Sequence, residues 1–469
     1  MTRSIPADFL FGVATAAFQI EGAAFEEGRT ASIWDAFARV PGAVANADNG
    51  DVACDHYHRY AEDVALMKEL GIQTYRFSTS WSRVRPDGGA VNAKGVDFYS
   101  RLVDELLEAD ILPWLTLYHW DMPQALEEGG GWTSRETVDR FVEYAMTMHD
   151  ALGDRVSRWT TLNEPWCSSF LSYTGGEHAP GRHSVEDGLL ASHHLLLAHG
   201  RTVEQLRERD AELDIGITLN LTVAEPADPD DAADRDAARR IDGQFNRWFL
   251  DPLFRGSFPA DIVEDVRRVD ADAVASFTDA VHEGDLETIA RPLDFLGVNY
   301  YHGEFVSGTV PADPPPSVPS GATYPTGSPY PSHEGIHWHD RGLDRTSMAW
   351  EVQPEGLTRL LQRVAADYDV PALYVTENGA AFDDEPIDGS VDDAERTDFV
   401  RDHVAATLDA RERGVDVRGY FYWSLLDNFE WAWGYGKRFG LVRVDYDTQV
   451  RTPKRSAREY ARMITERTI

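Results

Sequence analysis

Short apolar runs alternate with longer amphipathic segments along almost the whole chain. The short runs are rich in residues that favour strands, whereas the longer segments have apolar residues at helical spacing. Strands that alternate with helices in this way are typical of βα units joined into a parallel sheet. The predicted strands are eight in number and cover residues 9–18, 74–81, 112–119, 158–163, 215–220, 295–301, 373–377 and 419–424.

The longer segments have the pattern of helices that pack on a sheet. In the segment 57–71, Tyr60, Val64 and Met67 repeat at helical spacing, and Gly71 ends the pattern. Further helices are predicted within 97–111, 137–154, 189–209 and 355–369.

Eight βα units indicate an α/β fold, a single (β/α)₈ TIM barrel with elaborated βα loops. An open, doubly wound sheet is the alternative, but no Gly-rich phosphate turn follows the first predicted strand. One break in composition occurs at 311–335, where Pro, Ser and Gly exclude regular structure. That break is either a linker between domains or a loop. Because the βα pattern continues on both sides, we expect one domain, 1–469, with a loop excursion at about 302–348.

The formal net charge of −36 restricts the partners of this chain. It argues against binding to nucleic acid or to an anionic membrane, and no apolar run is long enough to span a bilayer. Lysine occurs only at 68, 94, 437 and 454. An acidic, Lys-poor surface suits hydration in concentrated salt, so we expect a salt-adapted protein. A GC-rich genome that favours Arg, Ala and Asp codons is the alternative explanation.

The cysteine content favours a reduced, cytoplasmic protein. Cys54 and Cys167 give neither a disulfide framework nor metal-ligand spacing. The apolar run 9–18 has the length of a signal-peptide core, but Asp8 adjoins it and a single Arg precedes it. We therefore do not expect export.

Hydrogen-bonding side chains and Trp residues collect at the ends of the predicted strands. Parallel barrels assemble their sites at the carboxyl ends of the strands, so these side chains are expected to meet. Amide and imidazole groups pair with sugar hydroxyls, and the faces of Trp rings bind the C–H face of a sugar. The pattern therefore predicts a carbohydrate site. Its residues are Gln19, Arg76, His119, Trp120, Asn163, Glu164, Asn220, Asn299, Tyr300, Tyr301, Glu377, Trp423, Glu430 and Trp431.

Two of these residues are carboxylates that end apolar strands. Glu164 stands in RWTTLNEPW and Glu377 in YVTENGAAF. Burying such a charge costs several kcal/mol unless it is paired. Two carboxyl groups in a sugar site are the equipment of glycoside hydrolysis, in which one donates a proton and the other attacks or activates water. That chemistry needs no metal and no other cofactor.

The sequence resembles the family-1 glycoside hydrolases, which include β-glucosidases and β-galactosidases. The resemblance covers nearly the whole chain, and the combination of TLNEPW with TENG far downstream is highly specific. The motifs that carry it are FLFGVATAAFQIEGA, RFSTSWSR, LYHWDMPQAL, TLNEPW, GVNYY, MAWEVQPEGL, YVTENGAAF and YFYWSLLDNFEWAWGYGKRFGL.

The resemblance implies catalytic roles for individual residues. It assigns Glu164 as the general acid/base and Glu377 as the nucleophile of a retaining enzyme, whose carboxyl groups lie about 5–5.5 Å apart. Arg76 and Tyr301 resemble the partners of the nucleophile and would favour its ionised form, and Asn299 belongs to the same catalytic set. Glu164, close to that negative charge, is expected to have a raised pKa.

The resemblance also implies a substrate-binding set. In it, Trp423 is the platform for the ring and Trp350 faces the leaving group. Glu430, taken as anionic, would repel a 6-phosphate. A packing role is expected for Cys167, and His193, His194 and His199 are expected either to pack or to contact solvent. The implied set comprises Gln19, His119, Trp120, Asn163, Trp350, Trp423, Glu430, Trp431 and Phe439.

We therefore predict a retaining, exo-acting β-glucosidase that hydrolyses terminal non-reducing β-D-glucosyl residues by double displacement. The expected partners are small molecules, namely β-glucosides, cello-oligosaccharides or aryl glycosides. A β-galactosidase or β-fucosidase, a transglycosylase of the same family and a non-catalytic sugar-binding barrel are the alternatives. The sequence gives no prediction of the oligomeric state.

Overall fold

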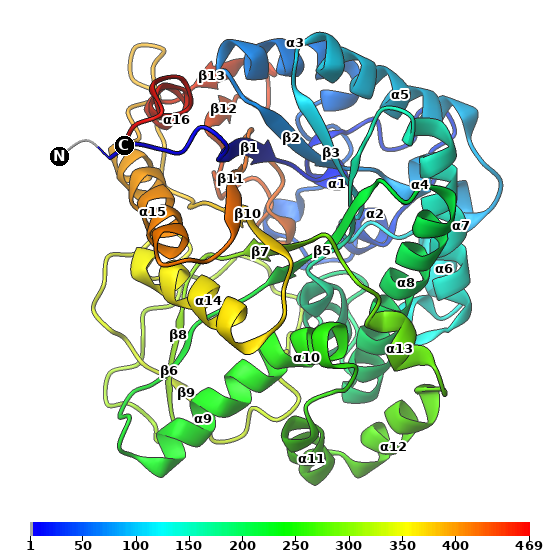
Figure 1. Ribbon diagram of the computed structural model, residues 1–469, viewed down its shortest axis with the longest axis vertical. Helices are drawn as coiled ribbons and strands as arrows, with labels where there is room; N and C mark the ends of the chain where they lie inside the picture. Colours follow the sequence, from blue (N-terminus) through cyan, green and yellow to red (C-terminus); the bar gives the residue numbers. More distant parts are fainter. Residues whose placement is uncertain (1–2) are drawn as a thin grey trace.

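Eight parallel strands close into a barrel in the computed structural model, which describes residues 3–469 (Figure 1). The predicted fold class, a (β/α)₈ barrel, is confirmed. The strands follow the order β1-β11-β10-β7-β5-β4-β3-β2 around the barrel. Their bounds are β1 Leu10–Ala14, β2 Thr74–Ser78, β3 Leu112–Tyr118, β4 Arg158–Asn163, β5 Asp214–Asn220, β7 Phe295–Asn299, β10 Ala372–Asn378 and β11 Val417–Trp423.

Each predicted strand matches a barrel strand, but the predicted runs 9–18, 74–81 and 295–301 extend past the ends of β1, β2 and β7. The stretch after β1 turns into the short helix α1 (Ala17–Ile20), and Trp81 begins the short helix α4 (Trp81–Val84). Both stretches lie where the chain leaves the barrel, so the apolar residues there are buried without being part of the sheet.

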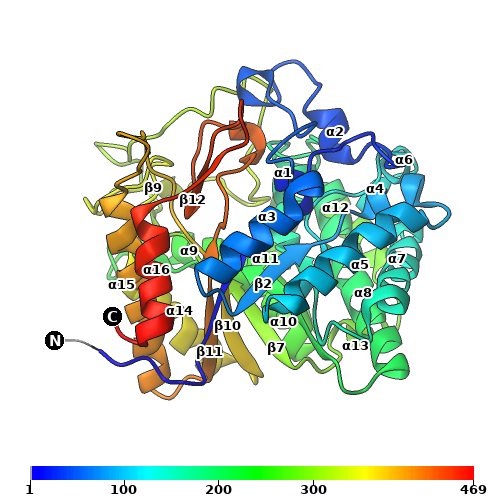
Figure 2. The same cartoon turned by 90° about the horizontal axis from the view of Figure 1, so that it is seen from above.

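Helices surround the barrel in Figure 1, and in the turned view of Figure 2 several of them lie in front of its strands. Those predicted from periodicity are α3 His56–Glu69, α5 Ala93–Glu108, α7 Glu136–Leu152, α8 Val185–Arg209 and α14 Pro354–Asp367. The other helices are α2 Ile33–Phe37, α6 Gln124–Glu128, α9 Ala232–Asp242, α10 Trp248–Arg255, α11 Ala260–Val269, α12 Ala271–Ala280, α13 Asp285–Ile289, α15 Ala394–Glu412 and α16 Arg455–Glu466.

Aromatic side chains fill the amino-terminal part of the barrel. Trp114 of β3 lies edge-on to the rings of Phe295, Tyr374 and Phe421, with ring centroids 4.8–5.0 Å apart. Its indole Nε1 donates to Thr160 Oγ1 (2.9 Å), so the buried N–H is satisfied. This packing leaves the carboxyl end of the barrel as the place for a site.

The long segment after β7 contains two short strands, with the Pro-rich residues between them. The strands are β8 (Glu304–Ser307) and β9 (His337–Trp338), which form a small sheet with β6 (Ala224–Pro226). The Pro-rich residues 311–335 form no helix or strand. A second small sheet pairs β12 (Val442–Val444) with β13 (Arg451–Pro453).

Backbone hydrogen bonds hold the Pro-rich segment in place. Thr323 and Tyr324 donate to the carbonyl of Gly42 (2.7 and 2.8 Å), and Gly327 donates to the carbonyl of Gly175 (2.7 Å). The segment thus joins the loops that follow β1 and β4.

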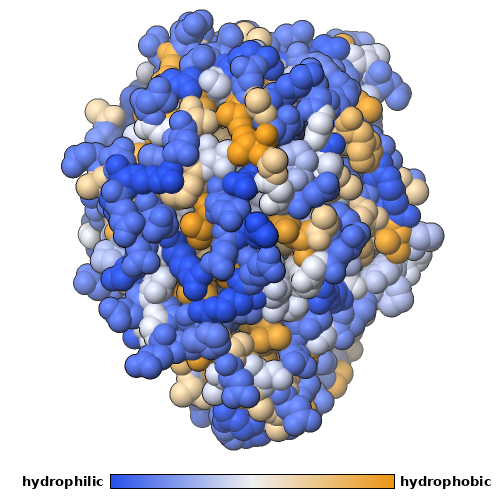
Figure 3. Space-filling model, turned by 90° about the vertical axis from the view of Figure 1, so that its right-hand side faces the viewer, coloured by the Kyte–Doolittle hydropathy of each residue, from blue (hydrophilic) through white to orange (hydrophobic). Residues whose placement is uncertain are grey.

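The surface is largely hydrophilic on the face shown in Figure 3, with apolar side chains scattered in small groups. Many of its Arg residues form ion pairs with Asp and Glu, as in the group of Arg239, Asp236, Asp261 and Asp265 on α9 and α11. Within residues 3–469, no helix is both long and apolar enough to cross a membrane.

Candidate active site

A pocket lies at the carboxyl ends of the barrel strands, with an empty volume of about 1060 Å³ that includes open solvent. Among the residues predicted for the site, four are buried and do not line the pocket: Gln19, Arg76, Asn163 and Tyr300. The others do line it: His119, Trp120, Glu164, Asn220, Asn299, Tyr301, Trp350, Glu377, Trp423, Glu430, Trp431 and Phe439.

Glu377 lies at the end of β10, where the pairing with β7 shifts and aligns it with Asn299. Its side chain is 3% exposed. Arg76 Nη1 contacts Glu377 Oε1 (2.6 Å), and the Tyr301 hydroxyl donates to Oε2 (2.8 Å). Both carboxylate oxygens therefore have a donor, which is the condition for keeping a buried charge.

Glu164 follows β4 and adopts a left-handed backbone conformation, with φ of 48°. A positive φ is strained for a residue with a side chain and is common at functional sites. Asn299 Nδ2 donates to Glu164 Oε1 (2.5 Å), and the Cys167 thiol donates to Oε2 (3.2 Å). Glu164 has no ion pair with Arg76, whose guanidinium faces Glu377.

The two carboxyl groups differ in how their charges are compensated. Burial and then the nearby Glu377 charge raise the pKa of Glu164 to about 8. Burial also raises the pKa of Glu377, but its ion pair with Arg76 and the hydrogen bond from Tyr301 oppose that rise. Arg76 forms its ion pair with Glu377 and so favours the ionised form of that carboxyl group. A single proton shared by Glu164 and Glu377 therefore resides on Glu164 at neutral pH.

A chain of hydrogen bonds orients His119. Arg76 has only donors, so the atom that faces its Nη2 at 2.6 Å is Asn163 Oδ1. Asn163 Nδ2 therefore donates to His119 Nε2 (3.1 Å). Burial and the Arg76 charge hold the pKa of His119 well below its usual value. The neutral ring then has its proton on Nδ1.

Three buried polar atoms of the predicted substrate-binding residues have no hydrogen-bond partner among residues 3–469. They are His119 Nδ1, Gln19 Oε1 and Glu430 Oε2. The amide nitrogen of Gln19 is already used, because it donates to the carbonyl of Phe429 (2.7 Å). Buried polar atoms without a partner are rare, so these three are available for the hydroxyls of a ligand.

Glu430 differs from its expected state. Burial, with Glu377 and Glu164 nearby, raises the pKa of Glu430 to about 8. The anionic form expected from the sequence is therefore wrong for the unliganded pocket at neutral pH, because no cation among residues 3–469 faces this carboxyl group. Of the described residues that line the pocket, none is Lys or Arg.

Aromatic side chains form the walls. Trp423 packs with Phe439, with Tyr301 and Trp350 against this group, and its ring stacks on His119 with centroids 5.5 Å apart. On another side of the pocket, the ring centroids of Trp120 and Trp431 lie 4.6 Å apart. Flat apolar faces beside polar atoms suit a sugar ring.

Several pocket residues were absent from the predicted site. Trp433 follows the predicted Trp431 by two positions, so the run EWAWG was a usable signal. The other residues come from loops whose course the sequence does not reveal. They are Leu171, Glu177, His178, Leu221, Thr222, Phe245, His302, Glu304, Tyr330 and Met348.

Cys167 was expected to have a packing role, and the structure adds a polar contact to it. The Cys167 side chain packs among apolar residues and also contacts Glu164. His178 packs against Trp34 and Trp120 at the pocket wall. Burial lowers the pKa of His178 to about 3, so its ring is neutral.

Comparison with known proteins gives full-length matches. The model of glycosyl hydrolase family 1 matches residues 1–469. Beta-glucosidase A of Thermotoga maritima is 42% identical over 98% of both chains. A bifunctional beta-D-glucosidase/beta-D-fucosidase of Bifidobacterium breve is 44% identical over 99% of both.

Solved structures agree with this chain over their full length. The psychrophilic beta-glucosidase BglU of Micrococcus antarcticus superposes with a TM-score of 0.96 at 55% identity, covering 99% of this chain and 98% of that one. A family 1 glycoside hydrolase of Thermotoga maritima, complexed with a cyclophellitol analogue as transition-state mimic, gives 0.90 at 42% identity, covering 100% and 99%.

Proposed function

Because the chain belongs to glycosyl hydrolase family 1, we propose that Glu377 is its nucleophile and Glu164 its general acid/base. The protein is a retaining β-glucosidase that releases terminal non-reducing β-D-glucosyl residues by double displacement. The β-galactosidase, β-fucosidase, transglycosylase and binding-module alternatives are not favoured by the matches.

In the first step, Glu377 attacks the anomeric carbon while Glu164 gives its proton to the glycosidic oxygen. A C–O ester bond forms and the glycosidic C–O bond breaks, so the leaving group departs as an alcohol. The contacts of Arg76 and Tyr301 with Glu377 support this division of roles. Asn299 assists as the donor to Glu164.

In the second step, Glu377 carries no charge, because its carboxylate has become an ester of the sugar. The pKa of Glu164 then falls, because the Glu377 charge contributed to raising it. Glu164 becomes a base, takes a proton from water, and the water oxygen attacks the anomeric carbon from the face that the leaving group vacated. The bond between the anomeric carbon and Glu377 breaks at the same time, and Glu377 leaves as a carboxylate. Two inversions return the sugar with its original configuration.

For the glucosyl unit, we assign Trp423 as the ring platform, with Trp120, Trp431 and Phe439 completing the wall. The unpartnered atoms of Gln19, His119 and Glu430 support hydroxyl recognition at this wall. Asn163 acts indirectly, through His119 and Arg76. Trp350 is assigned to the leaving group.

The observation that carries the proposal is that the buried carboxyl groups of Glu164 and Glu377 line one pocket and that, of these two, only Glu377 is ion-paired. The test is Glu377→Ala, which we expect to abolish hydrolysis. Added azide should then react directly and give a glucosyl azide of inverted configuration. In Glu164→Ala, azide should replace water in the second step and give retained configuration. An azide adduct of retained configuration from Glu377→Ala would place the nucleophile elsewhere.

Three broader properties complete the proposal. Residues 1–469 act as one catalytic domain, supported by a site whose residues come from both ends of the chain. The protein works in the cytoplasm, supported by the free, buried thiols of Cys54 and Cys167.

We also assign a salt-adapted surface, supported by the net charge of −36 and the scarcity of lysine. Activity on p-nitrophenyl β-glucoside should hold or rise as KCl is added, because screening weakens self-repulsion. A steady loss of activity from low salt upward would contradict the assignment.

A further inference from the structure

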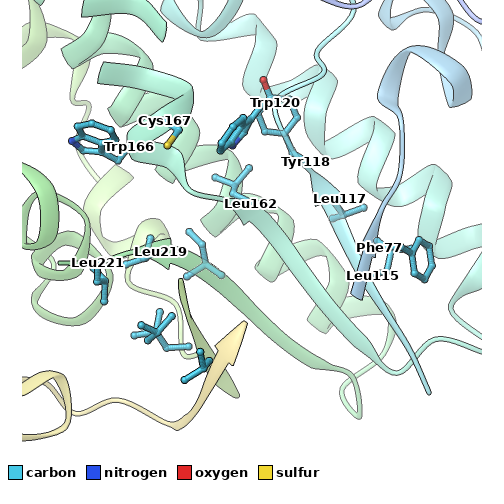
Figure 4. Packing of buried hydrophobic residues seen from close by; sticks show 14 of the residues in the cluster. Phe77, Leu115, Leu117, Tyr118, Trp120, Leu162, Trp166, Cys167, Leu219 and Leu221 are labelled. Carbon is cyan, nitrogen blue, oxygen red and sulfur yellow. The ribbon is translucent and has the colours of Figure 1, made fainter. Parts of the chain in front are cut away.

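Cys167 is held firmly beside the carboxyl end of β4. It is the first residue of a π-helix, η4 (Cys167–Thr174), and its backbone N–H donates to the carbonyl of Glu164 (3.0 Å). Its own carbonyl accepts a hydrogen bond from Ser172 Oγ (2.7 Å). Figure 4 shows its sulfur beside Trp166, beyond the strand that carries Leu162. π-helical turns are frequent at functional sites.

The thiol links the end of β5 to the Glu164 carboxyl. Asn220 Nδ2 donates to Cys167 Sγ (3.6 Å), and the thiol donates to Glu164 Oε2 (3.2 Å). The other oxygen, Oε1, accepts from Asn299. Both Glu164 oxygens are therefore fixed by donors from neighbouring elements, and the side chain has little freedom to turn.

We propose that Cys167 and Asn220 are positioning residues, in which Asn220 orients the thiol and the thiol holds Glu164 Oε2 for proton transfer to the leaving group. The inference rests on the proposed acid/base role of Glu164.

A thiol suits this place better than a stronger donor. Glu164 must hold a proton in the first step and be ionised in the second. The strong N–H of Asn299 occupies Oε1, so the proton belongs on Oε2, where the weak S–H donor competes least. Burial raises the pKa of the Cys167 thiol well above its usual value, so the sulfur keeps its hydrogen.

Five other titratable or polar side chains face Glu164 from neighbouring elements. They are Glu377 on β10, Arg76 on β2, Asn299 on β7, Tyr301 after β7 and Glu430 after β11. All of them are unchanged by substitution of Cys167, so a difference in pH dependence between Cys167 variants reports on the thiol.

The first test compares Cys167→Ala and Cys167→Ser with the unmodified enzyme. The alkaline limb of kcat/KM for p-nitrophenyl β-glucoside records loss of the Glu164 proton. Removing the donor should move that limb to higher pH, and the stronger hydroxyl donor should move it lower, each by about half to one unit. Three coincident limbs, or the reverse order, would overturn the proposal.

The second test varies the leaving group. Cellobiose needs protonation of its leaving oxygen, whereas 2,4-dinitrophenol leaves without it. Cys167→Ala should lose roughly tenfold in kcat/KM on cellobiose, the effect of about one hydrogen bond, and much less on 2,4-dinitrophenyl β-glucoside. An equal loss on both substrates would mean that Cys167 only packs.

Asn220→Ala should also lower kcat/KM on cellobiose, but by less than Cys167→Ala does. In the Cys167→Ala background, Asn220→Ala should cause no further loss, because its effect passes through the thiol. Additive losses would remove Asn220 from the proposal.

Cys54→Ala is the matched control, since this buried thiol donates to the carbonyl of Asp427. It should not move the alkaline limb. Cys167→Ser is nearly isosteric, so the pH test stands even where Cys167→Ala fails to fold.

Glu164→Gln distinguishes failure of the proposed acid/base role from failure of the positioning role. Full activity of Glu164→Gln on cellobiose would refute the acid/base role of Glu164 itself. Loss there without the ordered Cys167 shifts would refute only the positioning role.

Discussion

Tyr301→Phe removes one hydrogen bond from the proposed nucleophile and keeps the ring. The Tyr301 hydroxyl donates to Glu377 Oε2 (2.8 Å), and the remaining oxygen stays bound to Arg76. The ring keeps its packing beside Trp350, whose centroid lies 5.5 Å away. The change therefore isolates one donor to a buried carboxylate.

The size of the effect follows from the kind of bond that is lost. A hydrogen bond to a charged, buried group contributes about 1.5–3 kcal/mol, which corresponds to a pKa change of about 1–2 units. The hydroxyl favours the ionised form of Glu377, so its removal raises the pKa of Glu377. Attack requires the ionised form, and activity is therefore lost at a higher pH as the solution is acidified.

The assay is the pH dependence of kcat/KM on p-nitrophenyl β-glucoside, in which the acidic limb reports the nucleophile of the free enzyme. We expect the limb of Tyr301→Phe to move up by about one unit or more. The control is Tyr300→Phe, whose hydroxyl donates to the carbonyl of Gln353 (2.9 Å) and not to Glu377. A uniform loss of rate with an unmoved acidic limb would refute the role assigned to Tyr301.

Three further predictions concern the barrel and the pocket. Arg76→Met leaves Glu377 buried without its cation, so the free energy of unfolding should fall by about 3–5 kcal/mol in urea titrations; unchanged stability would mean that Glu377 is not charged in the folded protein. Trp114→Ala empties the aromatic packing of the barrel and should cost about 3–5 kcal/mol by the same measurement, and a cost below about 1 kcal/mol would contradict the tight packing. Trp433→Ala should raise KM for p-nitrophenyl β-glucoside severalfold, because a pocket wall is lost, whereas an unchanged KM would remove Trp433 from substrate binding.

The barrel was predictable because its strands are short runs of strand-forming residues that alternate with segments of helical periodicity. Runs such as 112–119 and 158–163 match β3 and β4 to within a residue. The helices between β5 and β7 were missed, because a segment such as 228–242 consists mostly of Asp, Arg and Ala and shows little apolar periodicity. There the side chain of Asp231 caps α9, and the helix packs through small residues such as Ala237.

The catalytic centre was predictable for a related reason. A carboxylate at the end of an apolar strand conflicts with its surroundings, and such conflicts mark Glu164 and Glu377. The protonation of Glu430 was not predictable, because it depends on which charges lie nearby in space. The contact of Cys167 with Glu164 and the place of Tyr330 in the pocket depend on loop paths that have no sequence pattern.

The aromatic packing around Trp114 fills the amino-terminal part of the barrel, so the pocket opens at the carboxyl end of the strands. The departing alcohol and the incoming water share that opening, so the first must clear the space before the second can react. A sugar that lingers there competes with water for the same ester. At high substrate concentration, the enzyme should therefore form some longer saccharides alongside free glucose.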